Sequence, residues 1–353
     1  MTMASSNEEY SVDLEIAHFF EQTSATRSEC DASAKELVGG DVVPVAIQGV
    51  CSYTVYAGPN QEFVVQFRLR SLDLKSEIVN LARHIHGSLV PDISFKGQLG
   101  KATDVTGKEP SCIYVMTRAQ GISYLDFILK HDFPMNSPEW FGWRHSMIAD
   151  FARFFALSWK HPQDVGPSYL NSLRFKCEKE LLILLGSLPA PFHPAVQKSL
   201  DSLPAIFDLP AVLLHKDFGQ FNIMVDDSSC HLVGVIDWAE AEIGPFGLNL
   251  YSLQRFTGHF HLKNGWERYD DYDSLQETFW SVFRNEVGGL TDSVVDAIHS
   301  AMVVGLLLSH GFTSRLANKP EPVPIEDDEN GGYKLLDLND LLINPATRIV
   351  RWP

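Results

Sequence analysis

The spacing of apolar residues changes character about one third of the way along the chain. Up to about residue 117, most apolar residues fall into short β-branched or aromatic runs that are typical of strands. Beyond that point, apolar residues recur every three to four positions over long stretches, as expected for amphipathic helices. The pattern predicts a small β-rich N-terminal part and a larger, mainly helical C-terminal part.

The N-terminal part is predicted to contain strands at 42–47, 53–57, 62–69, 93–97 and 112–116. Helical spacing covers 8–24, 31–37 and 72–86, and Gly39-Gly40 stops the second of these helices. In the C-terminal part, helices are predicted at 124–130, 140–159, 170–185, 195–203, 273–287 and 292–308, with Gly186 ending the third. Residues 321–332 are acidic with prolines at the start, so we expect a solvated or partly disordered loop, with an active-site lid as the alternative.

Length and charge narrow the classes of protein to which the chain can belong. A chain of 353 residues is long for one core and suits two lobes. Lys plus Arg number 28 against 45 for Asp plus Glu, a net charge of −17. This balance argues against nucleic-acid binding, which requires a basic face, and is compatible with a cationic substrate.

The cysteines and the apolar runs indicate the compartment. The five cysteines form no C-x-x-C pair, so we expect neither a structural zinc site nor a disulfide framework. The first ten residues are polar and acidic, unlike a signal peptide. The apolar run Ala301–Leu308 is much shorter than a membrane span. We therefore expect a cytoplasmic protein that does not contact a membrane.

The densest chemical signal is the segment His215-Lys-Asp217-Phe-Gly-Gln-Phe-Asn222, followed by Ile236-Asp237-Trp238. Phosphoryl transfer from ATP requires a carboxylate that accepts the proton of the attacking hydroxyl and oxygen ligands for magnesium. Asp217 suits the first role, and Asn222 and Asp237 offer the hard oxygen donors that Mg²⁺ prefers.

The surrounding sequence predicts how these residues meet. Residues 222–225 and 232–236 read as two strands joined by a turn at 226–229. A hairpin brings its two ends together, so Asn222 and Asp237 are expected to reach one metal ion. The alternative is that His215, Asp217 and Asn222 cap a loop through side-chain hydrogen bonds. The hairpin and its terminal Asp-Trp favour the functional interpretation.

In these residues, the chain resembles the aminoglycoside phosphotransferase and choline kinase family. The loop of that family usually reads H-G-D-x-x-x-x-N, and its second aspartate usually lies in I-D-W or I-D-F. Lys216 departs from that pattern, because the family usually has glycine there. The resemblance covers roughly residues 30 to 315. The segments 64–68, 151–156 and 245–247 make the whole chain most similar to fungal members.

The resemblance implies an α+β, two-lobed protein-kinase-like fold, with an N-terminal nucleotide-binding lobe at 1–117 and a C-terminal lobe at 118–353. ATP would lie in the cleft between the lobes and Mg²⁺ on its phosphates. The connection after the last strand of the first lobe, with Met116, Thr117 and Ala119, would contact the adenine through its backbone. A small-molecule hydroxyl would accept the phosphate.

The resemblance also places nucleotide-binding residues in the first lobe. Gly49 and Ser52 lie where the family has its nucleotide-positioning loop, although a plain hairpin turn fits equally well. The family usually has Lys or Arg where this chain has Gln66. Arg68 shares the strand face of Gln66 and could supply the charge, with Glu77 as the matching glutamate. The alternative is a surface arginine and a surface glutamate.

Several other residues carry weaker signals. His215 could act as a base, but we favour a structural role because Asp217 already fills that position. Glu240 and Glu242 could meet an amine at the substrate mouth, although solvated loop carboxylates are the simpler interpretation. His259 and His261, with Trp266, indicate a metal or aromatic site only weakly, because no third ligand is evident nearby.

Two hypotheses for function follow. The first is an ATP- and Mg²⁺-dependent phosphotransferase acting on a small-molecule alcohol, with Asp217 as catalytic base. The second, motivated by Gln66, is a pseudokinase that binds nucleotide or a partner without turnover. A protein kinase proper is disfavoured because the chain contains no G-x-G-x-x-G or A-P-E segment. The acceptor and the oligomeric state cannot be read from the sequence.

Overall fold

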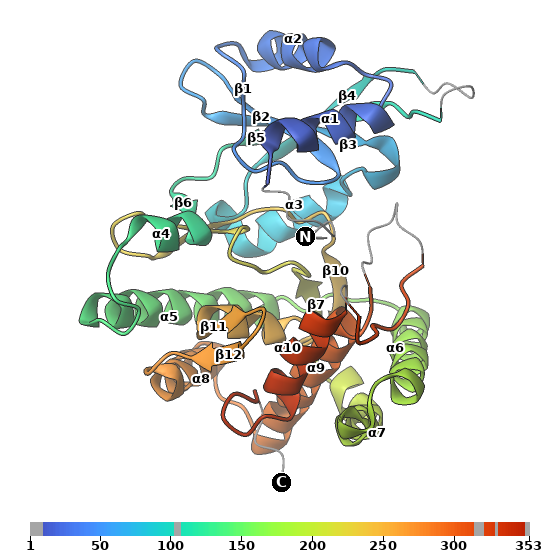
Figure 1. Ribbon diagram of the computed structural model, residues 1–353, viewed down its shortest axis with the longest axis vertical. Helices are drawn as coiled ribbons and strands as arrows, with labels where there is room; N and C mark the ends of the chain where they lie inside the picture. Colours follow the sequence, from blue (N-terminus) through green and yellow to red (C-terminus); the bar gives the residue numbers. More distant parts are fainter. Residues whose placement is uncertain (1–9, 102–106, 314–320, 329–330, 350–353) are drawn as a thin grey trace. The chain divides into compact units, whose positions relative to one another are not determined.

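The computed structural model describes residues 10–101, 107–313, 321–328 and 331–349. Contacts within the chain divide these residues into two compact units. The first contains the described residues up to Gln120, and the second contains those from Gly121 onwards. The boundary between the units falls in the short segment that follows the last strand of the first unit (Figure 1).

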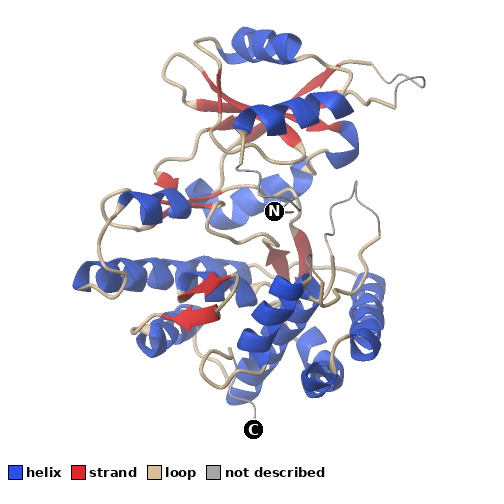
Figure 2. Cartoon of the chain, in the orientation of Figure 1, coloured by secondary structure: helices blue, strands red, loops and turns tan. Residues whose placement is uncertain are grey.

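The first unit is built on an antiparallel sheet with the strand order β1-β2-β3-β5-β4. Its strands are β1 Val43–Pro44, β2 Ser52–Ala57, β3 Phe63–Leu69, β4 Ile93–Leu99 and β5 Ser111–Thr117. The long members are rich in β-branched and aromatic residues, which pack well on a pleated surface. Figure 2 shows this sheet with helices against it.

One face of the sheet forms the core of the first unit. Alternate residues of β2, β3 and β5 turn to this face and pack against α1 (Val12–Gln22) and α2 (Arg27–Val38). Both helices begin at side-chain caps: Ser11 for α1, and a reciprocal capping box of Thr26 and Glu29 for α2. The cap at Thr26 explains why α2 starts earlier than the predicted residue 31.

The opposite face carries the residues between these core positions. The register pairs Ser52 with Arg68 and Thr54 with Gln66, so these side chains share a face, as predicted for Gln66 and Arg68. The chain leaves β3 through a short 3-10 turn, η1 (Arg70–Leu72), before α3 (Ser76–His86) begins. The predicted helical start at residue 72 was therefore too early. A second turn, η2 (Gly87–Leu89), leads into β4.

The second unit is mainly helical. Its helices are α4 Tyr124–Lys130, α5 Pro138–Lys160, α6 Pro167–Ser187, α7 His193–Phe207, α8 Tyr272–Val287, α9 Asp292–His310 and α10 Gly332–Leu342, with 3-10 turns η3 Ala190–Phe192 and η4 Leu250–Phe256. Helix α5 packs against α8, α6 against α7, and α9 against α7 and α10 (Figure 1). Phe151, Phe154 and Phe155 of α5 are buried and belong to the core of the second unit.

Helix α9 is long and apolar enough to cross a membrane by length and composition alone. However, 56% of its apolar window is buried inside the fold. Its buried residues face α6, α7, η4 and α10. The helix therefore serves as a central packing element of the second unit.

Three small sheets complete the second unit. Strands β6 (Ile122–Ser123), β8 (Ile223–Val225) and β9 (Leu232–Val235) form one antiparallel sheet. Strand β7 (Ala211–Leu214) pairs with β10 (Glu242–Pro245), and β11 (Gly258–His261) pairs with β12 (Gly265–Arg268). The predicted hairpin at 222–236 is thus confirmed as β8 and β9, whereas β10, β11, β12 and α10 were not predicted.

The predicted α+β class, with a β-rich first part and a helical second part, is confirmed. Two further local predictions were wrong. Helix α6 passes through Gly186 and ends only at Ser187, because the extended backbone at Leu188 leads into Pro189, which cannot continue the ladder. Strand β1 is two residues long rather than six. In the acidic segment 321–332, residues 329–330 lie outside the described part, so the lid alternative stays a prediction.

Candidate active site

The loop between β7 and β8 carries the H-x-D-x-x-x-x-N motif. Asn222 donates hydrogen bonds from Nδ2 to the backbone oxygen of Asp217 and to its carboxylate Oδ2, both at 2.9 Å. The backbone N–H of Gly219 also donates to the backbone oxygen of Asp217, at 2.9 Å. These bonds fix the orientation of an otherwise exposed carboxylate.

The loop is anchored by an aromatic side chain that points the other way. Phe218 is only 2% exposed, although Asp217 beside it is exposed. Its ring lies 5.1 Å from that of Phe151, 5.4 Å from Phe154 and 5.1 Å from Phe155, all on α5. The packing of Phe218 against α5 therefore fixes the backbone next to Asp217.

His215 joins the loop to the end of β9. It is 2% exposed, and its Nε2 lies 2.9 Å from the backbone oxygen of Ile236. The ring of Trp238 meets it edge-on at 4.7 Å. Burial lowers the pKa of His215, which outweighs the opposing effects of the Ile236 hydrogen bond and of nearby Asp217 and Asp237. A neutral imidazole that donates to a carbonyl suits the predicted structural role.

Asp237 lies two residues beyond the end of β9 and adopts a left-handed backbone conformation, with φ of +60°. Such a conformation is uncommon for any residue except glycine and concentrates at functional sites. The N–H of Ile236, one residue before, donates to the backbone oxygen of Asn222 at 2.9 Å. The hairpin thus brings Asn222 and Asp237 together, and the side chain of Asp237 is exposed.

Of the two glutamates predicted at a substrate mouth, Glu242 contacts a residue of the motif. Glu242 begins β10 and pairs in register with Leu214 at the end of β7. Its carboxylate accepts from Lys216 Nζ at 2.7 Å. Lys216 and Glu242 are therefore partners in a half-exposed ion pair, and Glu240 is exposed nearby in the chain.

In the first unit, the residues predicted to place the phosphates form a polar group on the sheet. Gln66 Nε2 donates to Ser52 Oγ and Thr54 Oγ1, each at 3.3 Å, and Gln66 Oε1 accepts from Arg68 Nη1 at 3.3 Å. Arg68 is 7% exposed, and its Nε donates to the backbone oxygen of Leu72 at 2.9 Å. The register thus brings Ser52, Gln66 and Arg68 together.

Two further residues of the first unit, Gly49 and Glu77, were predicted to contribute to nucleotide binding. Glu77 is exposed in the first turn of α3, and no ion pair joins it to Arg68 within the described residues. Gly49 is exposed in the loop before β2, where its carbonyl accepts from Ser52 N at 3.3 Å. The structure therefore links Gly49 to the polar group and leaves the pairing of Glu77 with Arg68 as a prediction.

The segment predicted to contact adenine ends the first unit. Met116 and Thr117 are the last residues of β5. Thr117 is held by Asp92, whose backbone oxygen accepts from Thr117 N at 3.1 Å and whose N–H donates to Thr117 Oγ1 at 3.0 Å. Ala119 follows in a segment without regular secondary structure. The backbone of this segment is thus well ordered at its start.

Comparison with known proteins decides the family. The sequence profile of the phosphotransferase enzyme family matches residues 48–277, which include both the polar group of the first unit and the motif of the second. The chain belongs to the phosphotransferase enzyme family. This confirms the resemblance and the protein-kinase-like fold class predicted from the sequence, whereas the likeness to fungal members stays a prediction.

The solved structures that match this phosphotransferase are distant from it in sequence. The GDP complex of wild-type aminoglycoside 2'-phosphotransferase-IIIa is 14% identical, with 77% of this chain and 84% of that chain covered and a TM-score of 0.49. Macrolide 2'-phosphotransferase type I is 13% identical, with 82% and 92% covered and a TM-score of 0.48. The comparison with curated proteins gave no match.

Two supporting residues of the phosphotransferase motif were not predicted from the sequence. Asn249 is buried and donates from Nδ2 to the backbone oxygen of His215 at 3.3 Å. Gln220 donates from Nε2 to the backbone oxygen of Arg255 at 3.0 Å, which ties the loop to η4. Asn249 lies 27 positions beyond Asn222, so only the fold reveals its contact, whereas Gln220 lies inside the motif and could have been considered.

Proposed function

We propose that this phosphotransferase moves the γ-phosphate of ATP to a hydroxyl of a small molecule, with Mg²⁺ as the metal and Asp217 as the catalytic base. The observation that carries the proposal is the hydrogen-bonded pair of Asp217 and Asn222 beside the strained Asp237, in a chain of this family.

Asp217 would accept the proton of the attacking hydroxyl. Its Oδ2 is occupied by the amide of Asn222, which leaves Oδ1 for the substrate. The carboxylate is exposed, so a substrate can reach it, and the buried Phe218 keeps it in place. Holding the base and the hydroxyl in one geometry removes much of the entropic barrier, and phosphoryl transfer requires no covalent enzyme intermediate.

The donor atoms fit a magnesium ion. The side-chain nitrogen of Asn222 is used in bonds to Asp217, so its Oδ1 is the atom that can face a cation. Asp237 offers an exposed carboxylate at the adjacent end of the hairpin. Both are hard oxygen ligands of the type that Mg²⁺ selects. A bound Mg²⁺ supplies charge neutralisation on the phosphate oxygens.

The experiment that tests this proposal compares Asp217→Ala with Asp227→Ala. Asp227 lies in the turn of the same hairpin, where it pairs with Lys130 at the surface, and serves as the control. Both proteins and the wild type would be incubated with Mg-ATP and a panel of amino alcohols, sugars and aminoglycosides, with ADP release as the readout. We expect Asp217→Ala to lower turnover on any accepted compound by about 10²-fold or more, and Asp227→Ala to leave it unchanged.

Binding of Mg-ATP must be measured on the same variants. Because Asp217 faces the acceptor in the proposal, its removal should leave nucleotide affinity within about threefold of the wild type, well below one decade. Turnover that survives in Asp217→Ala would remove the base from the proposal. Joint loss of turnover and nucleotide binding, in a folded variant, would also contradict the role assigned to Asp217.

A second candidate, a pseudokinase, is favoured by the environment of Gln66. A neutral amide occupies the slot where the family usually has Lys or Arg, and Arg68 is bound to the Leu72 carbonyl and to Gln66. The variant Arg68→Ala distinguishes the two candidates. A nucleotide site that uses this cation should lose affinity for ATP, whereas a scaffold that does not bind nucleotide should show no ATP binding before or after the change.

A further inference from the structure

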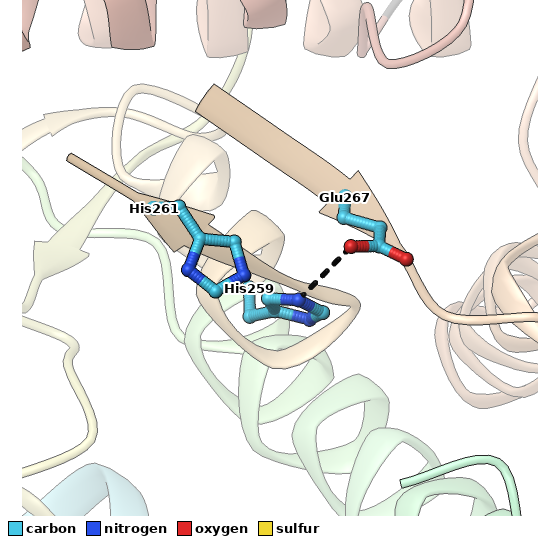
Figure 3. A group of neighbouring side chains, drawn as sticks. All are labelled: His259, His261 and Glu267. Carbon is cyan, nitrogen blue, oxygen red and sulfur yellow. Dashed lines mark ion pairs between the residues drawn. The ribbon is translucent and has the colours of Figure 1, made fainter. Parts of the chain in front are cut away.

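The hairpin of β11 and β12 places two histidines and a glutamate on one face. His259 and His261 are two residues apart on β11, so they share a face, and the register sets Glu267 of β12 directly opposite His259. One ligand atom from each of the three side chains lies within 4.8 Å of the other two. Figure 3 shows the three side chains converging beside the hairpin.

The distances suit a metal better than a simple ion pair. His259 Nε2 lies 3.3 Å from Glu267 Oε2, longer than the roughly 2.7–2.9 Å of a charge-assisted N–H···O bond. Two ligands that each lie about 2.1 Å from a tetrahedral zinc are about 3.4 Å apart. The imidazole of His261, which meets His259 edge-on with ring centroids 4.7 Å apart, requires only a side-chain adjustment to join them.

The opposite face of the hairpin makes a rigid support. Phe260 pairs with Trp266 on that face, and their ring centroids are 5.8 Å apart. Trp266 is 6% exposed, its backbone N–H donates to Asp340 at 2.7 Å, and its indole N–H donates to Asp337. The backbone under the cluster is therefore fixed by the core, so the two strands that carry the ligands are held in place before any ion binds.

We propose that His259, His261 and Glu267 form a binding site for a zinc-type divalent cation, separate from the magnesium ligands of the motif. Two imidazoles and one carboxylate select zinc-type ions over Mg²⁺, which prefers oxygen ligands throughout. Glu267 and His261 are exposed, so solvent water completes the coordination shell. The ion joins β11 to β12 and stabilises the hairpin that follows η4.

The site supplies the third ligand that was not evident from the sequence. Glu267 lies six residues beyond His261, and only the pairing of the two strands brings it opposite His259. Trp266, which the sequence grouped with the histidines, lies on the other face of the hairpin. The predicted absence of a nearby ligand was therefore wrong.

The test uses the full chain without a polyhistidine tag, stripped of metal with EDTA. Zn²⁺ would be titrated by calorimetry in excess Mg²⁺, and Co²⁺ would be added to read the coordination from its visible absorption. We expect one Zn²⁺ per chain. His261→Ala and His259→Ala should each weaken binding by about tenfold or more, and Glu267→Gln should weaken it as well. Zn²⁺ should raise the Tm of the wild type but not of His261→Ala.

Two controls separate this site from other histidines and from the motif. His18 is exposed on α1, so His18→Ala should bind Zn²⁺ like the wild type. Asp237→Asn should also bind Zn²⁺ like the wild type, whatever it does to Mg-ATP. Lack of saturable Zn²⁺ binding by the wild type would overturn the proposal, as would unchanged affinity in His261→Ala. His261 is exposed, so its variant stays informative if His259→Ala fails to fold.

Discussion

His215 and Lys216 are neighbours in the motif, yet their environments are opposite. His215 is 2% exposed, bonded to the Ile236 carbonyl and packed against Trp238. Lys216 reaches outwards to Glu242, and their side chains are 41% and 38% exposed. Burial decides how much each side chain contributes to the stability of the fold. Solvent screens the exposed ion pair of Lys216, whereas it cannot replace the buried hydrogen bond of His215.

We expect His215→Ala to lower the free energy of unfolding by about 2–4 kcal/mol, since it leaves a cavity and an unpaired carbonyl. The adjacent Lys216→Ala should change it by less than about 1 kcal/mol. Urea unfolding of both variants at neutral pH measures the difference. Equal effects of the two substitutions would show that His215 does not tie the loop to β9.

For single residues, the motif could be predicted because its members lie close together in the sequence. Asp217 and Asn222 are five positions apart, and one hairpin suffices to bring Asp237 to them. The surroundings of Gln66 and Arg68 depend instead on strand register and on the path of the chain after β3. The bond from Arg68 to the Leu72 carbonyl could not be predicted without them.

At the scale of elements, α10 is the largest feature that the sequence did not reveal. Its polar residues include Asp337 and Asp340, and acidic side chains are usually exposed. In the structure Asp337 is 3% exposed and Asp340 is 5% exposed. Asp337 accepts from Arg255 of η4 at 2.7 Å and lies 2.9 Å from His310 Nδ1 at the end of α9. Partners that are distant in sequence thus allow acidic residues of this helix to be buried.

This network makes stability depend on pH. Burial raises the pKa of Asp337, but the charges and hydrogen bonds of His310, Arg255 and Trp266 outweigh it and lower the pKa from 3.8 to about 2. The ionised carboxylate therefore stabilises the fold above about pH 4, and this contribution is lost as the pH falls from about 3.8 through about 2.

We expect Asp337→Asn to lower the free energy of unfolding by about 3–5 kcal/mol at neutral pH, because it breaks a buried charge network. The gap to the wild type should be unchanged at about pH 5 and smaller at about pH 3. Urea titrations at each pH measure it, with the exposed Asp227→Asn as the control. A gap that stays constant or widens at about pH 3 would contradict the network.

The hairpin of β11 and β12 depends on a glycine at the start of β12. Gly265 has φ of +78°, and a Cβ built there would lie 1.9 Å from Asp340 Oδ2. Gly288, after α8, has φ of +83° but no atom within 4 Å of its Cβ position. A Cβ added at Gly265 would therefore cause both backbone strain and a clash, whereas a Cβ added at Gly288 would cause backbone strain alone.

We expect Gly288→Ala to cost about 1–2 kcal/mol of stability, the typical cost of a left-handed residue with a Cβ. Gly265→Ala should cost more, because Asp340 must give up its bond to Trp266. Thermal and urea unfolding measure both variants. If Gly265→Ala proves no more harmful than Gly288→Ala, Asp340 does not hold the hairpin as described.

At the scale of the whole molecule, the change in apolar spacing near residue 117 predicts the two architectures of the chain. A sheet with one apolar face and a set of amphipathic helices leave strong periodic signals. The short β7–β10 and β11–β12 pairings leave none, because strands of four residues with mixed composition have no clear period. The absence of nucleic-acid binding, expected from the net charge of −17, stays a prediction.

In the proposed function, Asn222 and Asp237 hold magnesium for a nucleotide. Calorimetric titration of ATP into the wild type and into Asp237→Asn, with and without Mg²⁺, tests it most directly. We predict that the wild type binds ATP only with Mg²⁺ and that Asp237→Asn weakens this binding by about tenfold or more. ATP binding that is absent from the wild type, or that is equal in both proteins, would contradict the assignment of Asn222 and Asp237 as magnesium ligands.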